Sequence, residues 1–101
     1  MKITNLELQV KTLPESPGIY KFFNNESQVI YIGKAINLKK RVGSYFKKNH
    51  THFRTKLLVK QIIKVENIVV ETEMDALLLE NNLIKKFKPK YNVLLKDDKT
   101  Y

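Results

Sequence analysis

Two tyrosines, Tyr20 and Tyr31, are the first residues of this chain whose type and spacing suit chemistry. A free tyrosine hydroxyl has a pKa near 10, so only about one in a thousand is ionised at pH 7. A nearby cation favours the phenolate, and Lys34 and Arg41 are the candidates that follow the second tyrosine. With that help and a metal-bound water, a tyrosine could accept a proton in a hydrolytic reaction. The alternative is that both rings simply pack in a core.

The same two cations suit a phosphate group. Arg41 offers a planar fork that can donate two hydrogen bonds to one phosphate, whereas Lys34 offers a point charge. Both residues could position a phosphate without taking part in a reaction. The pattern therefore predicts a phosphate site and leaves a catalytic part open.

Glu80 is the acid that does not match its neighbours in the sequence. On a helix it falls within about 60° of five apolar residues, which are Ala76, Leu77, Leu83, Ile84 and Phe87. An uncompensated carboxylate on such a face costs several kcal/mol. One interpretation is an ion pair with one of the nineteen basic residues. The other is a ligand of a divalent cation, and a single carboxylate suits Mg²⁺ better than a zinc cage or a two-metal site.

The distribution of charge points to a polyanionic partner. The net charge is +9, and residues 27–65 contain ten Lys or Arg residues and no Asp or Glu. A solvated basic face is the simpler explanation, but 39 residues without one acid favour a nucleic-acid partner. A membrane surface is disfavoured, because the basic segment lacks an apolar face opposite its lysines.

Length and composition set the class of protein. With 101 residues, ten aromatic residues and 43% hydrophobic content, we expect residues 1–101 to form one domain, the N-terminal part of a longer chain. The absence of cysteine excludes disulfides and thiolate metal sites. No apolar run approaches 18 residues and no signal-peptide pattern is present, so we expect a cytoplasmic protein without membrane contact.

A β-hairpin is expected to carry both tyrosines. Its strands are residues 18–23 and 28–33, joined by a polar turn at residues 24–27. Alternation predicts that Tyr20 and Phe22 share one face, and that Val29, Tyr31 and Gly33 share one face of the partner strand. A hairpin alone is marginal in water, so a larger sheet must complete it.

The other elements follow from periodicity and capping signals. Helices are predicted over residues 4–11, over 38–46 with Asn37 as N-cap, over 53–64, and over 73–87 with Thr72 as N-cap. Residues 33–36 are predicted as a loop, 68–72 as a third strand and 88–95 as extended chain. The fold class is therefore α+β, with a small three-stranded antiparallel sheet flanked by helices.

Several blocks of sequence together resemble a known family. Gly18-Ile19-Tyr20 and Tyr31-Ile32-Gly33, ten residues apart, resemble the signature of the GIY-YIG nuclease superfamily. Further blocks at residues 13–20, 31–46, 80–86 and 89–92 resemble the N-terminal nuclease domain of the UvrC type, over residues 11–101. The resemblance implies a DNA endonuclease that makes the 3′ incision of bacterial nucleotide excision repair. It also implies a UvrB-type partner, contacted through regions absent from this chain.

The resemblance also implies roles for individual side chains. Glu80 would be the single protein ligand of one Mg²⁺ or Mn²⁺, and Tyr31 would be the general base, assisted by Lys34. The remaining implied roles are positioning of water and phosphate by Tyr20 and Tyr45, stabilisation of transition-state charge by Arg41, and support of the far wall by Asn92. Which tyrosine takes the proton is left open.

DNA contacts are expected within the basic segment, at Lys34, Asn37, Lys39, Lys40, Arg41, Lys47 and Lys48. The isolated domain is expected to be a monomer. Three alternatives remain: a non-catalytic nucleic-acid-binding module, a domain that docks on an acidic protein, and a GIY-YIG nuclease of another branch. Glu80 discriminates between enzyme and binder, because a pure binder has no use for a carboxylate in an apolar face.

Overall fold

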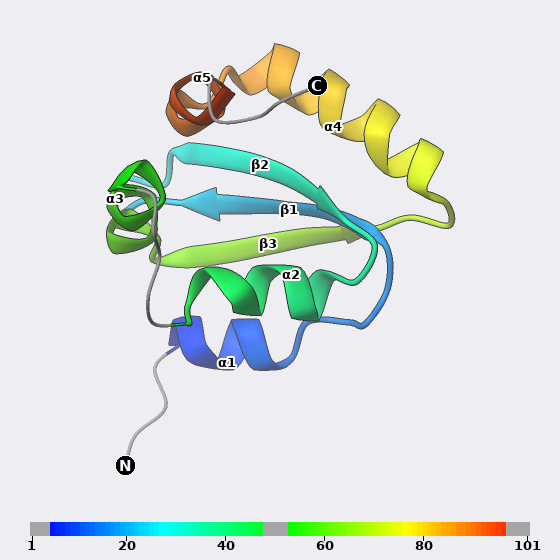
Figure 1. Ribbon diagram of the computed structural model, residues 1–101, viewed down its shortest axis with the longest axis horizontal. Coiled ribbons are helices and arrows are strands. Elements are labelled where there is room, and N and C mark those ends of the chain that lie inside the picture. The colour runs from blue at the N-terminus through cyan, green and yellow to red at the C-terminus, as the bar shows by residue number, and fades with distance from the viewer. Residues whose placement is uncertain (1–4, 48–52, 97–101) are drawn as a thin grey trace.

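A three-stranded antiparallel sheet organises the molecule (Figure 1). The computed structural model describes residues 5–47 and 53–96. Strand order is β2-β1-β3, so β1 (Gly18–Phe23) lies between β2 (Val29–Ala35) and β3 (Lys64–Val69). The predicted α+β class and three-stranded sheet are confirmed. Among the described residues, no helix has the length and apolar character needed to cross a membrane.

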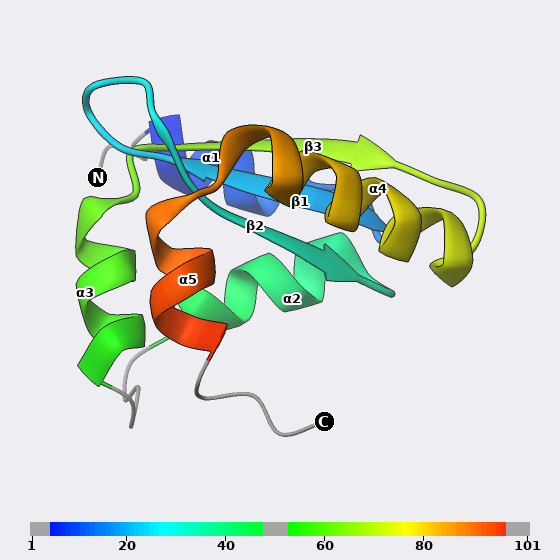
Figure 2. The ribbon, with the colours of Figure 1, turned by 90° about the horizontal axis from the view of Figure 1, so that it is seen from above.

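Helices cover both faces of this sheet. Figure 1 shows α1 (Asn5–Lys11) and α2 (Leu38–Tyr45) on one face and α4 (Glu73–Phe87) on the other. In the view from above, α3 (Phe53–Gln61) and α5 (Lys90–Lys96) lie at the end of the sheet that carries the hairpin turn (Figure 2). The helices thus leave both outer strands, β2 and β3, as edges of the sheet.

Each face of the sheet has its own apolar cluster. The face toward α1 and α2 is aromatic and includes Tyr20, Phe22 and Tyr31, which pack against residues of all helices except α4. The face toward α4 is smaller and aliphatic, built on Ile19 and Ile32. Alternation along β1 produces this division, because neighbouring side chains of a strand point to opposite faces.

A bulge in β2 changes the predicted alternation. Phe22 pairs with Tyr31, but Phe23 pairs with Val29, which leaves Ile30 as an extra residue. The expectation that Val29 shares the face of Tyr31 is therefore wrong: Val29 packs with the aliphatic cluster under α4. The pairing of Tyr20 with Gly33 keeps the predicted face for both.

The helix starts agree with the capping signals, whereas two other boundaries differ. Asn37 Oδ1 accepts the N–H of Lys40 at 3.1 Å, and Thr72 Oγ1 accepts that of Asp75 at 3.1 Å. The predicted loop at residues 33–36 is wrong in part, because β2 continues to Ala35 along β1. Helix α3 ends at Gln61 rather than at residue 64.

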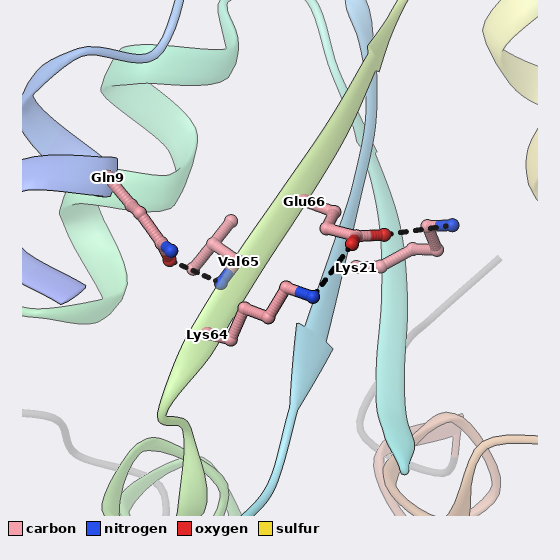
Figure 3. A network of polar contacts seen from close by, with 5 residues as sticks. All are labelled: Gln9, Lys21, Lys64, Val65 and Glu66. Atoms are coloured by element: carbon pink, nitrogen blue, oxygen red, sulfur yellow. Dashed lines mark hydrogen bonds and ion pairs between the residues drawn. The ribbon is translucent and has the colours of Figure 1, made fainter. Parts of the chain in front are cut away.

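The third strand begins four residues earlier than predicted. It spans Lys64–Val69 rather than residues 68–72, because pairing with the whole of β1 sets its limits. Within it only Val65 is buried, Glu66 is half-buried and the other residues are exposed, so the strand lacks the regular alternation by which a sequence indicates a half-buried strand. Figure 3 shows this strand, with Glu66 between Lys64 at 3.0 Å and Lys21 at 3.5 Å.

The segment after α4 was predicted to be extended, and this expectation is wrong. Lys88, in the left-handed conformation (φ 48°), ends α4, and α5 then begins after the buried Pro89. Proline suits the first turn of a helix, where its missing N–H is not needed. Tyr91, only 3% exposed, packs into the aromatic cluster and holds this short helix in place.

Candidate active site

Three tyrosines from separate elements meet on the aromatic face of the sheet. Tyr20 comes from β1, Tyr31 from β2 and Tyr45 from the last turn of α2, and their ring centres lie 5.9–6.2 Å apart. All three are buried, with exposed fractions of 1%, 3% and 7%. The hydroxyls of Tyr20 and Tyr45 are hydrogen-bonded at 2.9 Å. The structure thus brings together the three tyrosines that the sequence singled out.

The two glycines of the hairpin make this arrangement possible. A Cβ atom at Gly33 would overlap the ring of Tyr20, which lies directly over that residue. A Cβ atom at Gly18 would meet the carbonyl oxygen of Ile68 in β3, and would lie 2.8 Å from Cδ1 of Leu38. Gly33 therefore leaves room for a site residue, whereas Gly18 leaves room for the pairing of β1 with β3.

Arg41 is the cation beside the tyrosines. It lies one turn before Tyr45 on α2, with its guanidinium carbon 5.4 Å from the centre of that ring. Interaction with Tyr20 raises the pKa of Arg41, against a smaller opposing effect of burial. Arg41 is an exposed residue overall, so it can also bind a phosphate at the surface.

Burial favours the protonated form of the Tyr20 and Tyr31 hydroxyls. Burial raises the pKa of Tyr20, and repulsion from Tyr45 and Tyr31 adds to it. Burial also raises the pKa of Tyr31, followed by the effects of Tyr45 and of the Glu80 carboxylate. Arg41 lowers both pKa values, which is the direction predicted for a nearby cation, but burial outweighs it. Proton uptake by a tyrosine thus requires further positive charge.

Glu80 is a buried carboxylate without a cationic partner in the part of the chain that is described. It is 9% exposed, on the face of α4 that also buries Ala76. Within residues 5–47 and 53–96, no lysine or arginine forms an ion pair with it. The Glu80 charge raises the pKa of Tyr31, with a smaller influence than burial, Tyr45 or Arg41. Among the described residues the ion-pair interpretation of Glu80 therefore finds no support.

The donor set around Glu80 fits one hard divalent cation. Among the described residues, no three His, Cys, Asp or Glu side chains gather as a metal cage would require. Mg²⁺ needs only one or two carboxylates, since it retains several waters and takes phosphate oxygens as further ligands. A single buried carboxylate beside hydroxyl groups matches that requirement.

A cavity of about 340 Å³ opens beside Lys34 and Arg41. It is lined by Lys34, Ala35, Ile36, Arg41, Glu73 and Ala76, so β2, α2 and α4 all contribute to it. Lys34 and Arg41 both line it, and their role in binding a phosphate stays a prediction. Glu73 was not singled out from the sequence. The signal was its place seven residues before Glu80, two turns away on the same helix face.

Asn92 fixes the edge of β2 next to Tyr31. Its Oδ1 accepts the N–H of Ile32 and its Nδ2 donates to the carbonyl of Ile32, both at 2.8 Å. The side chain thus replaces a neighbouring strand at this point of the edge. The sequence predicted Asn92 in the site wall, and the structure places it on the backbone between Tyr31 and Gly33.

The residues expected to contact DNA are mostly exposed. Lys34, Lys39, Lys40, Arg41 and Lys47 are all exposed. Asn37 is half-buried, and its side-chain oxygen caps α2. Lys48 lies outside the described residues.

Comparison with known proteins decides the family. A family model described as the UvrC-like GIY-YIG domain matches residues 16–93. This chain belongs to the family of UvrC-like GIY-YIG domains. The UvrABC system protein C of Flavobacterium psychrophilum is 57% identical over 101 residues, and that of Bacteroides thetaiotaomicron is 64% identical over 92 residues. The match covers 17% and 15% of the lengths of these two curated relatives, so the chain spans only a small part of them.

Solved structures of the family have the same fold. The GIY-YIG N-terminal endonuclease domain of UvrC from Thermotoga maritima, bound to its catalytic divalent cation magnesium, matches with a TM-score of 0.78 and 40% identity. The match covers 91% of this UvrC-like domain and 99% of that chain. Variants of the Thermotoga domain with a tyrosine replaced by phenylalanine, or an asparagine by alanine, are also bound to the divalent cation.

Proposed function

We propose that this UvrC-like domain is a divalent-cation-dependent DNA endonuclease, with Glu80 as the protein ligand of one Mg²⁺ or Mn²⁺. The observation that carries the proposal is the buried Glu80 carboxylate, within electrostatic reach of Tyr31 and without a cationic partner among the described residues. Magnesium in the related Thermotoga domain supports the choice of cation. When bound, such a cation polarises a phosphoryl oxygen and makes water more acidic.

Each clustered side chain has a part in the proposed reaction. Tyr31 would accept the proton of the attacking water after first releasing its own proton to solvent; Arg41 lowers and Glu80 raises the pKa of this hydroxyl. Its raised pKa in the free protein means that Tyr31 gives up its own proton only when positive charge is added nearby. The paired hydroxyls of Tyr20 and Tyr45 hold water and phosphate in position. These residues match in type the tyrosines substituted in the Thermotoga domain.

Cations and an amide complete the proposed site. Arg41 stabilises the charge that develops on the phosphate, through two hydrogen bonds from its fork. Lys34, across the cavity from α4, binds the same or a neighbouring phosphate. Asn92 fixes the backbone beside Tyr31 and so sets the position of its hydroxyl.

We further propose the biological substrate and setting. The domain would make the 3′ incision on lesion-bearing duplex DNA during bacterial nucleotide excision repair, in the cytoplasm. Residues 1–101 would act as one nuclease domain of a longer chain, and a UvrB-type partner would act through regions outside them. The curated relatives, which are UvrABC system proteins C, support this proposal.

Incision with and without a divalent cation tests the proposal. A full-length protein that carries this domain is combined with the other proteins of a UvrABC system and a lesion-bearing duplex. We expect incision on the 3′ side with Mg²⁺ or Mn²⁺ and none with EDTA. DNA binding without any cut under all conditions would instead identify a non-catalytic binding module.

The salt dependence of DNA binding tests the basic surface. Each phosphate contact contributes a slope of about −0.9 to a plot of log affinity against log salt. We expect Lys39→Ala/Lys40→Ala to reduce the slope by nearly two phosphate contacts for all sequences alike. The control Lys85→Ala/Lys86→Ala removes the same charge from α4, outside the acid-free segment, and should leave the slope unchanged. Equal effects of both pairs would show that net charge alone matters.

A further inference from the structure

We propose that Gln61 and Tyr91 are positioning residues that set Asn92, and through it the strand that carries Tyr31. The proposal rests on the proposed function, because it concerns the accuracy of the same site. The path runs from α3 through α5 to the edge of β2. Nothing in the sequence motifs assigns a role to Gln61.

The first contact joins two helices. Nε2 of Gln61, the last residue of α3, donates a hydrogen bond to the hydroxyl of Tyr91 at 2.6 Å. Tyr91 is 3% exposed and belongs to the aromatic cluster that contains Tyr20 and Tyr31. Burial of the Tyr91 ring in this cluster sets the position of the side chain, and the hydrogen bond from Gln61 sets its orientation.

The second contact joins α5 to the sheet. Helix α5 has only seven residues, which is too short to be stable on its own. It therefore depends on its anchors, the buried Pro89 and Tyr91, for its position. Asn92 follows Tyr91 directly, so a shift or rotation of the anchored turn moves the Asn92 amide. That amide needs both of its 2.8 Å bonds to the backbone of Ile32.

The third step concerns the strand itself. The Ile32 backbone points away from β1 at the free edge of β2, and Asn92 is what it binds there. The bulge at Ile30 interrupts the pairing of β2 with β1 just before Tyr31. Because a bulge weakens the strand register locally, the contact of Asn92 with Ile32 adds to the pairing with β1 in keeping Tyr31 and Gly33 in place.

Hydrogen exchange at the Ile32 amide measures this contact directly, without any catalysis. In this 101-residue chain, we compare the parent with Tyr91→Phe and Gln61→Leu, each of which removes the hydrogen bond and keeps the approximate shape. We expect faster exchange at Ile32 in both, by between about twofold and tenfold, the effect of one hydrogen bond. Asn92→Ala should give the largest increase in the exchange rate of Ile32, since it removes the acceptor of that N–H.

The other edge of the sheet supplies a matched control. Gln9 Oε1 accepts the N–H of Val65 in β3 at 2.9 Å (Figure 3). Gln9→Leu should accelerate exchange at Val65 and leave Ile32 unchanged, whereas Tyr91→Phe should do the reverse. If Tyr91→Phe accelerates all core amides equally, Tyr91 acts on global stability and the positioning role is wrong.

A double-mutant comparison tests whether the contact between Asn92 and the Ile32 backbone affects incision. Tyr91→Phe should slow incision by the same two- to tenfold in the parent, and should have no further effect in the Asn92→Ala background. Unchanged exchange at Ile32 in Tyr91→Phe and Gln61→Leu, with fast exchange in Asn92→Ala, would overturn the proposal. If exchange responds as expected but Asn92→Ala cuts normally, the positioning holds and the proposed role of Asn92 in catalysis fails instead.

Discussion

At each edge of the sheet a side-chain amide forms hydrogen bonds with the strand backbone, but the number of bonds differs between the two edges. On β3, Gln9 accepts one backbone N–H, that of Val65. On β2, Asn92 both accepts from and donates to the backbone of Ile32. Unpaired edges invite pairing with other chains, and an amide side chain prevents this at either edge. The single bond of Gln9 suffices for that purpose.

The second hydrogen bond of Asn92 restricts sliding of β2 along its own axis, whereas one bond alone would mainly restrict movement away from the amide. The surroundings explain the difference. Next to Ile32 lies Tyr31, buried in the aromatic cluster with Tyr20 and Tyr45, and its pKa is raised by the Glu80 charge. Next to Val65 lies Glu66, partly exposed between two lysines. We infer that the β2 edge is held for the accuracy of the site and the β3 edge for stability alone.

Glu80→Gln gives the largest expected effect and tests the β2 side of this comparison. Loss of the carboxylate should reduce incision by at least about a thousandfold, since a bound cation contributes several kcal/mol to the barrier. The melting temperature in EDTA should hold or rise, because a buried charge is removed. Stabilisation by added Mn²⁺ should disappear. Melting of parent and variant, each with EDTA and with Mn²⁺, checks this.

A different melting result would contradict the assignment of Glu80. If Glu80 instead neutralised a buried cation, the variant would lose roughly 3–5 kcal/mol of stability with or without metal. Such a loss in EDTA would falsify the ligand role and most of the nuclease proposal.

Tyr31→Phe tests whether the Tyr31 hydroxyl, on the strand that Asn92 contacts, takes part in the reaction. The ring still packs, so folding and DNA binding should be kept, while incision should fall by about a hundredfold or more through loss of the proton acceptor. The measurement is incision of a lesion-bearing duplex by variant and parent, with Tyr20→Phe alongside. Normal cutting by Tyr31→Phe with none by Tyr20→Phe would exchange the roles of the two tyrosines.

The two hairpin glycines separate stability from site geometry. Gly18→Ala forces a methyl group against the backbone of β3 and should lower the free energy of unfolding by about 1–3 kcal/mol or more. Gly33→Ala forces a methyl group against the buried ring of Tyr20, which is a side chain rather than backbone. It should cost less stability than Gly18→Ala does. It should also break the hydrogen bond between the Tyr20 and Tyr45 hydroxyls, and so slow incision about tenfold. Urea unfolding and incision assays of both variants check this difference. Equal incision by Gly18→Ala and Gly33→Ala would contradict a special role of Gly33 in the site.

Glu66→Gln gives the smallest expected effect, on the β3 side. The hydrogen bond from Lys64 lowers the pKa of this carboxyl, with Lys21 assisting and slight burial opposing. A lowered pKa stabilises the fold above the ordinary range of a glutamate, about pH 4–5, and the gain is lost as pH falls through the folded-state pKa. Because the side chain is 42% exposed, the effect at pH 7 should stay below about 1 kcal/mol.

Parallel urea unfolding of parent and Glu66→Gln at pH 7 and pH 3 measures this contribution. The difference should be present at pH 7 and absent at pH 3, and incision should not change. A loss of incision in Glu66→Gln would show that the β3 edge also serves the site.

Local signals predicted those parts of the fold that depend on neighbours in sequence. The hairpin, the caps Asn37 and Thr72, and the limits of α4 all follow from turn residues, capping side chains and periodicity. The short helix α5 and the start of β3 do not, because both are selected by partners far along the chain. The bulge that turns Val29 to the other face likewise depends on pairing.

The sequence by itself determined the residue types and blocks that mark the family: the two glycine–tyrosine tripeptides, Arg41, the out-of-place Glu80 and Asn92. Only the tertiary structure decided what surrounds them. Glu80 lacks a cationic partner among the described residues and acts on Tyr31, and Asn92 binds a strand 60 residues away. The physical reason is that desolvation and hydrogen bonding depend on which groups are close in space, and these groups are brought together only by the packing of α4 and α5 along β2.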